Sequence, residues 1–276
     1  MTIPMVGVAR RLATVAPQVL TVTARVLASG QVLLGPETSA LEAELGRALG
    51  HRHVVCVASG TDALRLALQA LGVGAGAEVL VPAFTAVPTA AAVCAVGAVP
   101  VLVDVDPEGA TIDPACARKC LTERTRAIVA VHLYGRPAPV EELRSLGLPV
   151  LEDAAQGHGV VAPGSPGPVA YSFYPTKNLG GIGDGGAVAT EDEHLAEEIR
   201  LLRHHGMQAL YVHERIATNS RMSELEAAFL RESLPQLRAW NERRSSIARR
   251  YREAAPQLRW QTDHSLHVHH LCVLRS

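Results

Sequence analysis

The stretch VVCVASGTDALRLALQALG, residues 54–72, changes its periodicity partway along. Residues 54–57 form a short, continuously apolar run, as expected of a strand that is buried on both faces. Ser59, Gly60 and Thr61 then open an amphipathic segment that ends at Gly72, which is typical of a helix. A buried strand that leads directly into a helix is the repeating unit of parallel α/β sheets, so this stretch decides the fold class.

The same alternation of short apolar runs and amphipathic segments continues along the chain. The pattern predicts further strands over 78–81, 99–103, 127–131, 149–151 and 171–174, and helices over 39–49, 88–96 and 140–145. We therefore predict an α/β fold, in which a mixed, mostly parallel sheet is sandwiched by helices.

The chain is predicted to divide into three parts. Residues 1–30 would form an N-terminal arm or helix, residues 31–240 a large domain, and residues 241–276 a connector helix with the start of an incomplete small domain. The helical stretch 223–255 has no strand between its turns and would lead out of the large domain. The apolar segment 269–274 is predicted to be the first strand of the small domain.

Composition excludes several classes of function. The chain has 276 residues, 48% hydrophobic and 19% charged, with a formal net charge of −1, so nothing favours nucleic acid or an anionic membrane as a partner. Residues 1–7 lack a signal-peptide pattern, and no uninterrupted apolar run reaches the ~18 residues of a membrane span. Five cysteines without a CxxC pair predict free thiols in the cytoplasm. The histidines over 264–270 lack an obvious acidic or cysteine partner, so no metal is predicted.

Ligands of parallel sheets bind at the carboxyl ends of the strands. In this chain those positions hold the segment 59–61, Thr85, His132, Asp153 and Lys177. The start of the helix at Gly60 and Thr61 would offer free backbone N–H groups to a phosphate, although the same residue types also serve as ordinary helix caps.

Asp153 and Lys177 are the candidate catalytic residues. A carboxylate directly after a buried strand could cap the next helix, or it could face a pyridinium nitrogen and keep that nitrogen protonated. Lys177 and Lys119 are the two lysines of a chain that otherwise uses arginine. Arginine cannot form a Schiff base and lysine can, which favours a covalent role for Lys177 over that of a surface charge. The glycine-rich loop over 180–186 is either a wide hairpin or backbone held close to a ligand.

Eight segments in order along the chain resemble one known family, the DegT/DnrJ/EryC1/StrS aminotransferases. These are nucleotide-sugar aminotransferases of fold type I that use pyridoxal phosphate (PLP). The resemblance rests on residues 59–64 (SGTDAL), 81–85 (VPAFT), 103–106 (VDVD), 132–135 (HLYG), 152–156 (EDAAQ), 172–178 (SFYPTKN), 183–186 (GDGG) and 219–222 (NSRM).

The resemblance implies a PLP-dependent enzyme that transfers an amino group from glutamate or glutamine to a keto-sugar nucleotide. Lys177 matches the lysine that forms the Schiff base and then shuttles a proton, and Asp153 matches the partner of the pyridine nitrogen. The phosphate contacts are matched by Gly60, Thr61 and Ser172.

Two further matches concern the ring of the cofactor and the second subunit. Gln156 matches a residue that packs near the ring and its hydroxyl group. Asn219 matches a phosphate contact contributed in trans, so the resemblance implies a homodimer. The family usually places an aromatic side chain over the ring, two residues after the position of Phe84, where this chain has Ala86.

Two alternatives stay open. Dehydratases of the same scaffold commonly replace the Schiff-base lysine with histidine, which Lys177 opposes, but the related aromatising synthases keep the lysine. The chain is also about a hundred residues shorter than the family usually is, and it could be a fragment or a truncated, catalytically impaired relative.

Overall fold

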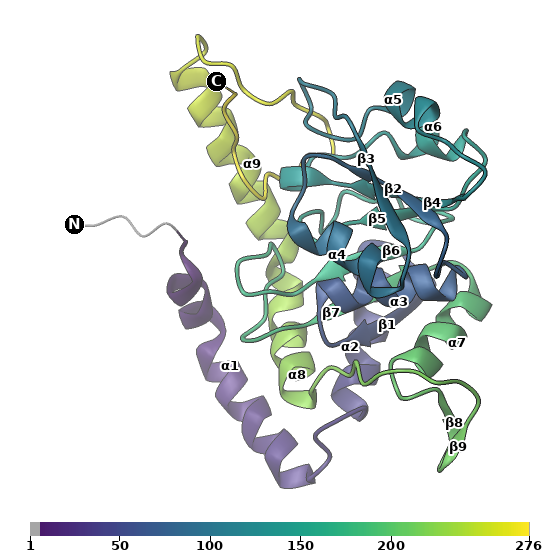
Figure 1. Cartoon of the computed structure of the whole chain (residues 1–276). Helices are drawn as coiled ribbons and strands as arrows, with labels where there is room; N and C mark the ends of the chain where they lie inside the picture. The colour runs from purple at the N-terminus through teal and green to yellow at the C-terminus, as the bar shows by residue number, and fades with distance from the viewer. Residues whose placement is uncertain (1–5, 276) are drawn as a thin grey trace.

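The computed structural model describes residues 6–275 as three layers, with helices on both faces of a central sheet (Figure 1). The strands are β1 (His53–Val57), β2 (Glu78–Pro82), β3 (Val99–Val103), β4 (Thr125–Val131), β5 (Val150–Asp153), β6 (Val169–Ser172), β7 (Gly186–Thr190), β8 (Met207–Ala209) and β9 (Val212–His213). The helices are α1 (Val8–Ser29), α2 (Pro36–Leu49), α3 (Gly60–Ala70), α4 (Val87–Ala95), α5 (Pro114–Lys119), α6 (Val140–Arg144), α7 (Glu193–Leu202), α8 (Glu224–Ser233) and α9 (Leu237–Ala254).

Seven strands form the central sheet in the order β1-β7-β6-β5-β4-β2-β3. The strands β6, β5, β4, β2 and β3 run parallel to one another, whereas β7 is antiparallel to both of its neighbours. This mixed, mostly parallel α/β sheet confirms the predicted fold class. The strand β7 was not predicted, because its sequence GAVAT follows a glycine-rich loop and contains a single large apolar side chain.

The core lies in two layers, one on each face of the sheet. Alternate residues of the strands point to opposite faces, so in β4 Val129 packs beneath α3, α4 and α7, while Ile128 packs beneath α5 and α6. Helices α2 and α8 complete the second layer through Leu41, Leu45 and Phe229. Both faces of the central strands are therefore buried, which explains their continuously apolar sequences.

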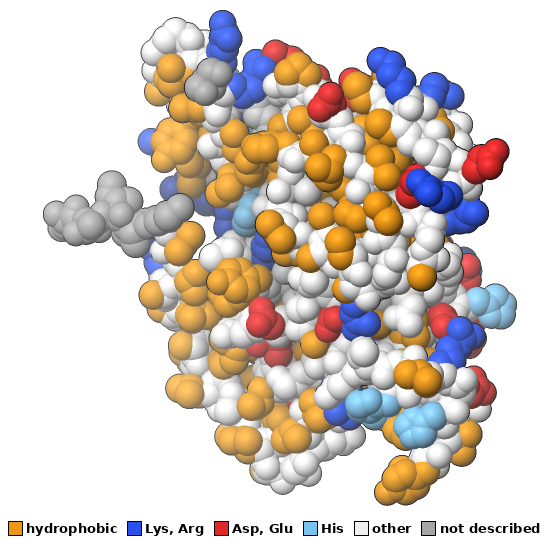
Figure 2. Space-filling view, in the orientation of Figure 1, with side chains coloured by type: hydrophobic (Ala, Val, Ile, Leu, Met, Phe, Trp, Pro, Cys, Tyr) orange, Lys and Arg blue, Asp and Glu red, His pale blue; other side chains and the backbone are white. Residues whose placement is uncertain are grey.

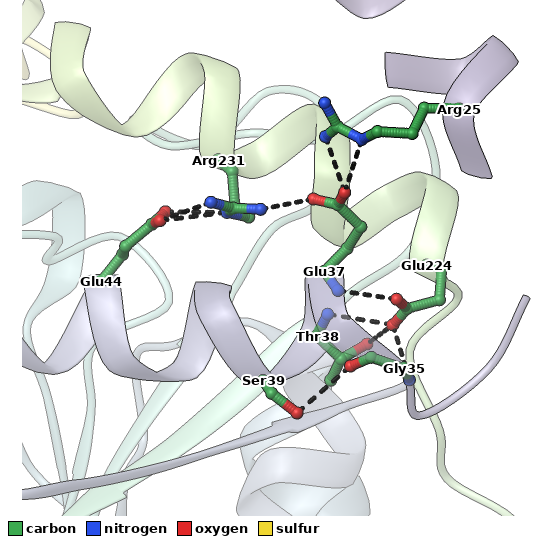
Figure 3. Close-up of polar contacts among 8 residues, drawn as sticks. All are labelled: Arg25, Gly35, Glu37, Thr38, Ser39, Glu44, Glu224 and Arg231. Atoms are coloured by element: carbon green, nitrogen blue, oxygen red, sulfur yellow. Dashed lines mark hydrogen bonds and ion pairs between the residues drawn. The ribbon is translucent and has the colours of Figure 1, made fainter. Parts of the chain in front are cut away.

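A buried carboxylate determines where α2 begins. Glu224 at the start of α8 is 1% exposed and accepts hydrogen bonds from the backbone N–H groups of Gly35, Glu37 and Thr38, at 3.0, 2.7 and 2.9 Å (Figure 3). Helix α2 consequently begins at Pro36, three residues before its predicted start. An acid from a distant segment supplies the acceptors that a local N-cap side chain would otherwise provide.

Arg231 of α8 strengthens the same junction. Its guanidinium donates to Glu37 at 2.6 Å and to Glu44 at 2.7 Å, and Glu37 in turn accepts from Arg25 of α1 at 2.7 Å (Figure 3). Hydrogen bonds to Glu44 and Glu37 raise the pKa of Arg231, which keeps its charge fixed. These pairs tie α1, α2 and α8 together.

Helix α1 lies along α8 at the edge of the molecule, with Val15, Val22 and Val26 buried (Figure 1). Its other side exposes apolar residues such as Leu20 and Leu27, and Figure 2 shows apolar side chains along this edge. Within residues 6–275, α1 is the one helix long and apolar enough to cross a membrane by length and composition, although the sequence showed no uninterrupted apolar run. That property alone is weak evidence, because core helices and signal sequences share it.

The C-terminal part of the chain agrees with the prediction in its helices but not in its last segment. The predicted helical stretch 223–255 consists of α8, a short 3-10 turn (Leu234–Gln236) and α9. The strand predicted over 269–274 is wrong, since this segment makes one isolated bridge, between Leu274 and Trp260, and no strand. The N–H groups of Val268 and Leu271 instead donate to Gly135 and Tyr134, so this segment packs on a turn of the large domain. The predicted domain boundaries stay predictions.

Candidate active site

A cavity of about 270 Å³ lies at the carboxyl ends of the parallel strands. Six of the seven predicted site residues line it, namely Gly60, Thr61, Asp153, Gln156, Ser172 and Lys177. A larger hollow of about 900 Å³ lies between α2, α8, α9 and the C-terminal segment, away from the strand ends. We take the smaller cavity as the candidate site, because it combines a carboxylate, an amine and a helix N-terminus.

Asp153 is the last residue of β5 and is 5% exposed. Its carboxylate accepts hydrogen bonds from the Thr89 hydroxyl at 3.0 Å and from the Ala155 N–H at 3.1 Å. Burial raises the pKa of Asp153, and these two donors together with the charge of Lys177 offset only part of that effect. Within residues 6–275, no arginine, lysine or histidine nitrogen lies within 4.0 Å of this carboxylate. The site thus holds a buried anion that lacks a close cation.

Lys177 lies on the turn that follows β6, as the sequence predicted. Its backbone N–H donates to the Tyr174 carbonyl at 2.8 Å, and the guanidinium of Arg11 donates to the Pro175 carbonyl at 2.8 Å. Helix α1 therefore holds the lysine turn in place. Burial lowers the pKa of Lys177, although the charge of Asp153 opposes this shift, so the amine loses its proton more easily than a surface lysine does.

The N-terminus of α3 opens into the same cavity. Ser59 caps the helix, because its hydroxyl accepts the N–H of Asp62 at 3.1 Å, while Gly60 and Thr61 form the first turn. The first N–H groups of a helix have no partner within the helix and favour an anion. Gly60 lies against Ser172, and a Cβ atom on this glycine would come within 2.5 Å of the Ser172 Cβ.

The glycine-rich loop is a wide hairpin that joins β6 to β7, and it also brings backbone close to the helix N-terminus. Gly186 pairs with Val57 on one side and with Ser172 on the other. A Cβ atom on Gly186 would lie 2.3 Å from the Ser59 carbonyl oxygen. The absence of a side chain at this position is therefore required for the turn at residues 59–60 to approach β7.

Gln156 and Asn219 differ in where the structure places them. Gln156 lines the cavity, and its side-chain oxygen accepts the N–H of Tyr134 at 2.6 Å. Asn219 does not line the cavity; it is exposed, and its side-chain oxygen accepts from Arg221 at 2.9 Å. Within one chain, the described residues therefore bring together every predicted site residue except Asn219.

The structure also locates the two residues that mark the departure from the family pattern. Ala86 lines the cavity and immediately precedes α4. Phe84 is 51% exposed and points into a different hollow, where it packs edge-on against Tyr134 with ring centroids 6.3 Å apart. Phe84 therefore does not replace the missing aromatic side chain.

Sequence reasoning missed Thr89 and misplaced His132. Thr89, 1% exposed in the first turn of α4, contacts both Asp153 and the Thr85 hydroxyl, the latter at 3.1 Å. Its only signal was a spacing of four residues from Thr85, which lies just before α4. His132 follows β4 but does not line the cavity; its ring lies 3.0 Å from Glu152 on the opposite face of β5.

Comparison with known proteins agrees with this geometry. The model of the DegT/DnrJ/EryC1/StrS aminotransferase family matches residues 15–275. The chain is 49% identical over 238 residues to dTDP-3-amino-3,4,6-trideoxy-alpha-D-glucose transaminase of Streptomyces venezuelae, covering 83% of this chain and 62% of that protein. It is 44% identical to UDP-N-acetyl-3-dehydro-alpha-D-glucosamine 3-aminotransferase of Acidithiobacillus ferrooxidans, covering 91% and 70%.

Solved structures agree in fold over almost the whole chain. The crystal structure of DesV of S. venezuelae, in complex with a ketimine intermediate, superposes with a TM-score of 0.96 at 42% identity, covering 99% of this chain and 78% of that chain. NtdA of Bacillus subtilis, with bound cofactor PMP, superposes with a TM-score of 0.94 at 32% identity, covering 98% and 66%. The chain spans 62% and 64% of the length of two of the curated relatives that it matches. On this evidence of sequence and fold, the chain belongs to the DegT/DnrJ/EryC1/StrS aminotransferase family.

Proposed function

We propose that this protein is a PLP-dependent aminotransferase that moves an amino group from glutamate or glutamine to a keto-sugar nucleotide or a related cyclic ketone. The observation that carries the proposal is that one cavity holds a buried Asp153 and a partly buried Lys177 beside the N-terminus of α3. Relatives named as transaminases of dTDP- and UDP-linked sugars support the substrate class.

The residues of the cavity fit pyridoxal phosphate. Asp153 is a buried carboxyl group with no Lys, Arg or His nitrogen within 4.0 Å among residues 6–275, and a protonated pyridine nitrogen would supply a close cation. The free N–H groups of Gly60 and Thr61, with the adjacent Ser172 hydroxyl, are suited to hold a phosphate group. Gln156 lies where it can pack beside the ring. The fit thus provides a partner for each end of the cofactor.

When bound, PLP supplies an electron sink that stabilises negative charge on the substrate carbon. The protein contributes the groups that set the protonation of the ring and that carry protons. Asp153 would keep the pyridine nitrogen protonated, because a nearby anion favours the charged form of that nitrogen. Lys177 would act as the attachment point and then carry a proton, since its lowered pKa allows the amine to lose and regain a proton within the cavity.

The proposal includes a homodimer in the cytoplasm. Asn219 is exposed and outside the cavity of its own chain, which is compatible with a contact to the phosphate group in the other subunit. The apolar outer side of α1 offers a surface that a second copy could cover. A dimer would thus complete the set of predicted phosphate contacts.

One relative favours a second candidate function. The structure of 3-amino-5-hydroxybenzoic acid synthase superposes with a TM-score of 0.87 at 32% identity over 95% of this chain. Ala86 leaves the cavity wall beside α4 without an aromatic side chain, which would leave space for a cyclic substrate. Measuring amino transfer from glutamate against loss of water from a cyclic substrate separates the two activities.

The test compares Lys177→Ala with Lys119→Ala, which removes the other lysine at an exposed position of α5. We expect the unchanged chain and Lys119→Ala to develop a visible absorbance band with PLP and to retain the cofactor covalently after borohydride reduction. Lys177→Ala should do neither. Covalent cofactor in Lys177→Ala, or no cofactor in any of the three proteins, would contradict the proposal.

A further inference from the structure

Three side chains of the C-terminal segment converge although the sequence did not predict a site there. Asp263, His267 and His269 each place one potential ligand atom within 4.8 Å of the others. The expectation that the histidines lack an acidic partner was wrong, because Asp263 directly precedes them and its carboxylate turns back toward two of them. This cluster lies outside the candidate active site.

The rings of His267 and His269 lie next to each other in the C-terminal segment. They are stacked at a centroid distance of 3.9 Å. His269 has a positive φ of 45°, so this segment is not a regular extended strand. Val268, between the two histidines, enters the core, and His270 contacts the Asn178 side chain at 3.0 Å.

The polar atoms of the cluster are only partly satisfied. The Nε2 atom of His267 lies 3.4 Å from the Tyr134 carbonyl oxygen, so this nitrogen carries the ring proton if it donates there. The Nδ1 atom then presents a lone pair to the Asp263 carboxylate at 3.5 Å. Among the described residues, this buried Nδ1 atom has no hydrogen-bond partner. In this tautomer, a cation placed between the lone pair and the carboxylate would satisfy both groups.

Two of the three distances between the ligand atoms are close to those found around a metal, and the third is within 4.8 Å. Zinc binds histidine nitrogens and carboxylate oxygens at about 2.0–2.2 Å in a tetrahedron, which places neighbouring ligand atoms roughly 3.3–3.5 Å apart. The Asp263 Oδ1 atom lies 3.5 Å from His267 Nδ1 and 3.6 Å from His269 Nε2.

We propose that Asp263, His267 and His269 bind a divalent transition metal, with Zn²⁺ as the best match to two imidazoles and one carboxylate. The Asp263 side chain is 57% exposed, so a water molecule can reach the fourth position. The positive charge of Arg252 acts against a cation here, but its guanidinium is held by the Gln261 carbonyl at 2.8 Å, and Asp263 supplies the opposing charge.

The metal would order the C-terminal segment, because all three ligands belong to that segment. Tyr134 links this segment to the candidate active site, because its carbonyl faces His267 while its N–H donates to Gln156. The proposed metal site follows from the geometry of the C-terminal segment and does not depend on the proposed aminotransferase activity.

The test uses the untagged 276-residue protein, which is treated with a chelator and then titrated with Zn²⁺ by calorimetry. The absorbance of bound Co²⁺ reports whether the site is tetrahedral. Asp263→Asn and His269→Gln remove proposed ligands. His264→Gln is the matched control, because His264 belongs to the same histidine-rich segment but is exposed and absent from the cluster. Circular dichroism checks that each variant is folded; the exposed Asp263 position tolerates Asn without repacking.

We expect one Zn²⁺ per chain, an affinity at least about tenfold weaker in Asp263→Asn and in His269→Gln, and little change in His264→Gln. Zinc should also raise the melting temperature of the unchanged protein and of His264→Gln, but not that of the double variant Asp263→Asn with His269→Gln. An unchanged protein that binds no Zn²⁺, or a folded double variant that binds it as tightly as the control, would overturn the proposal.

Discussion

Two adjacent carboxylates point to the two faces of strand β5 and have opposite surroundings. Glu152 and Asp153 are both buried, and because strand residues alternate they point to opposite sides of the sheet. Glu152 contacts the His132 ring at 3.0 Å, the Arg144 guanidinium at 2.8 Å and the Ser165 hydroxyl at 2.5 Å. Asp153 receives hydrogen bonds from two uncharged donors.

The pKa values of the two carboxyls diverge accordingly. Burial tends to raise both, but His132, Ser165 and Arg144 lower the pKa of Glu152 overall, whereas the pKa of Asp153 stays raised. This difference in pKa helps to distinguish a ligand-binding carboxylate from a structural one. A carboxylate that is fully paired stabilises the fold, and one left without a close cation is available to a ligand.

The largest expected effect concerns activity. Asp153→Asn removes the anion proposed to face the cofactor, and losing one partner of a buried ion pair costs about 3–5 kcal/mol, which is about 10²–10⁴-fold in rate. Glu152→Gln should leave the rate per folded molecule close to that of the unchanged chain. Steady-state amino transfer, corrected for cofactor content, measures both. Equal losses in the two variants would remove the distinction between the faces.

The next-largest effect is on stability, where Glu152→Gln should be the more harmful of the two substitutions. Glu152→Gln should destabilise the cofactor-free chain by about 3 kcal/mol at pH 7, because it removes the carboxylate that contacts Arg144, the His132 ring and Ser165. Asp153→Asn should be neutral or stabilising, since it removes a buried charge without a close cation. Urea unfolding measures the two free energies, and a larger loss in Asp153→Asn would contradict the assignment.

The contributions of Glu152 and Asp153 to the free energy of unfolding should change with pH in opposite directions. The folded-state pKa of Glu152 is below the ordinary 4.5, so its stabilisation is present above that value and is lost as the pH falls through the lowered pKa. The folded-state pKa of Asp153 is above the ordinary 3.8, so its protonated form favours folding at low pH, and the advantage is lost as the pH rises through the raised pKa. The benefit of Asp153→Asn should therefore vanish in acid.

A smaller effect is expected at Thr89. Its hydroxyl donates to Asp153, and a hydrogen bond to a charged group contributes about 1.5–3 kcal/mol, so Thr89→Val should lower the rate by about tenfold or more. Thr89→Ser keeps the donor and serves as the control. If Thr89→Ser lost as much activity as Thr89→Val, the methyl group and not the hydrogen bond would be responsible.

The smallest effect is a shift in the pH dependence of cofactor attachment. Burial lowers the pKa of Lys177 from the ordinary 10.5 and the charge of Asp153 opposes that change. The attachment rate should rise with a midpoint below 10.5, and Asp153→Asn should move the midpoint lower still. Glu152→Gln should leave it in place. Stopped-flow absorbance over a pH series checks the order, and a midpoint that moves upward in Asp153→Asn would contradict it.

Much of the site could be predicted because its residues follow local signals. Lys177 and Asp153 each follow an apolar run within a few residues, and strand ends of a parallel sheet meet at one edge. Thr89 could not be assigned from the sequence, because its role depends on a contact with Asp153, 64 residues away. Asn219 stays a prediction, since one chain alone does not bring it to the cavity.

The amino-acid sequence by itself determined the alternation of strands and helices, the edge where a ligand binds, and the lysine and carboxylate placed there. These follow from short-range patterns of apolar residues, glycine and turns. Only the tertiary structure decided that Glu152 is paired while Asp153 is not, that Glu224 caps a helix far away in the chain, and that Asp263 meets His267 and His269. The reason is physical: burial and the charges of distant neighbours control a carboxylate, and neither is encoded in adjacent residues.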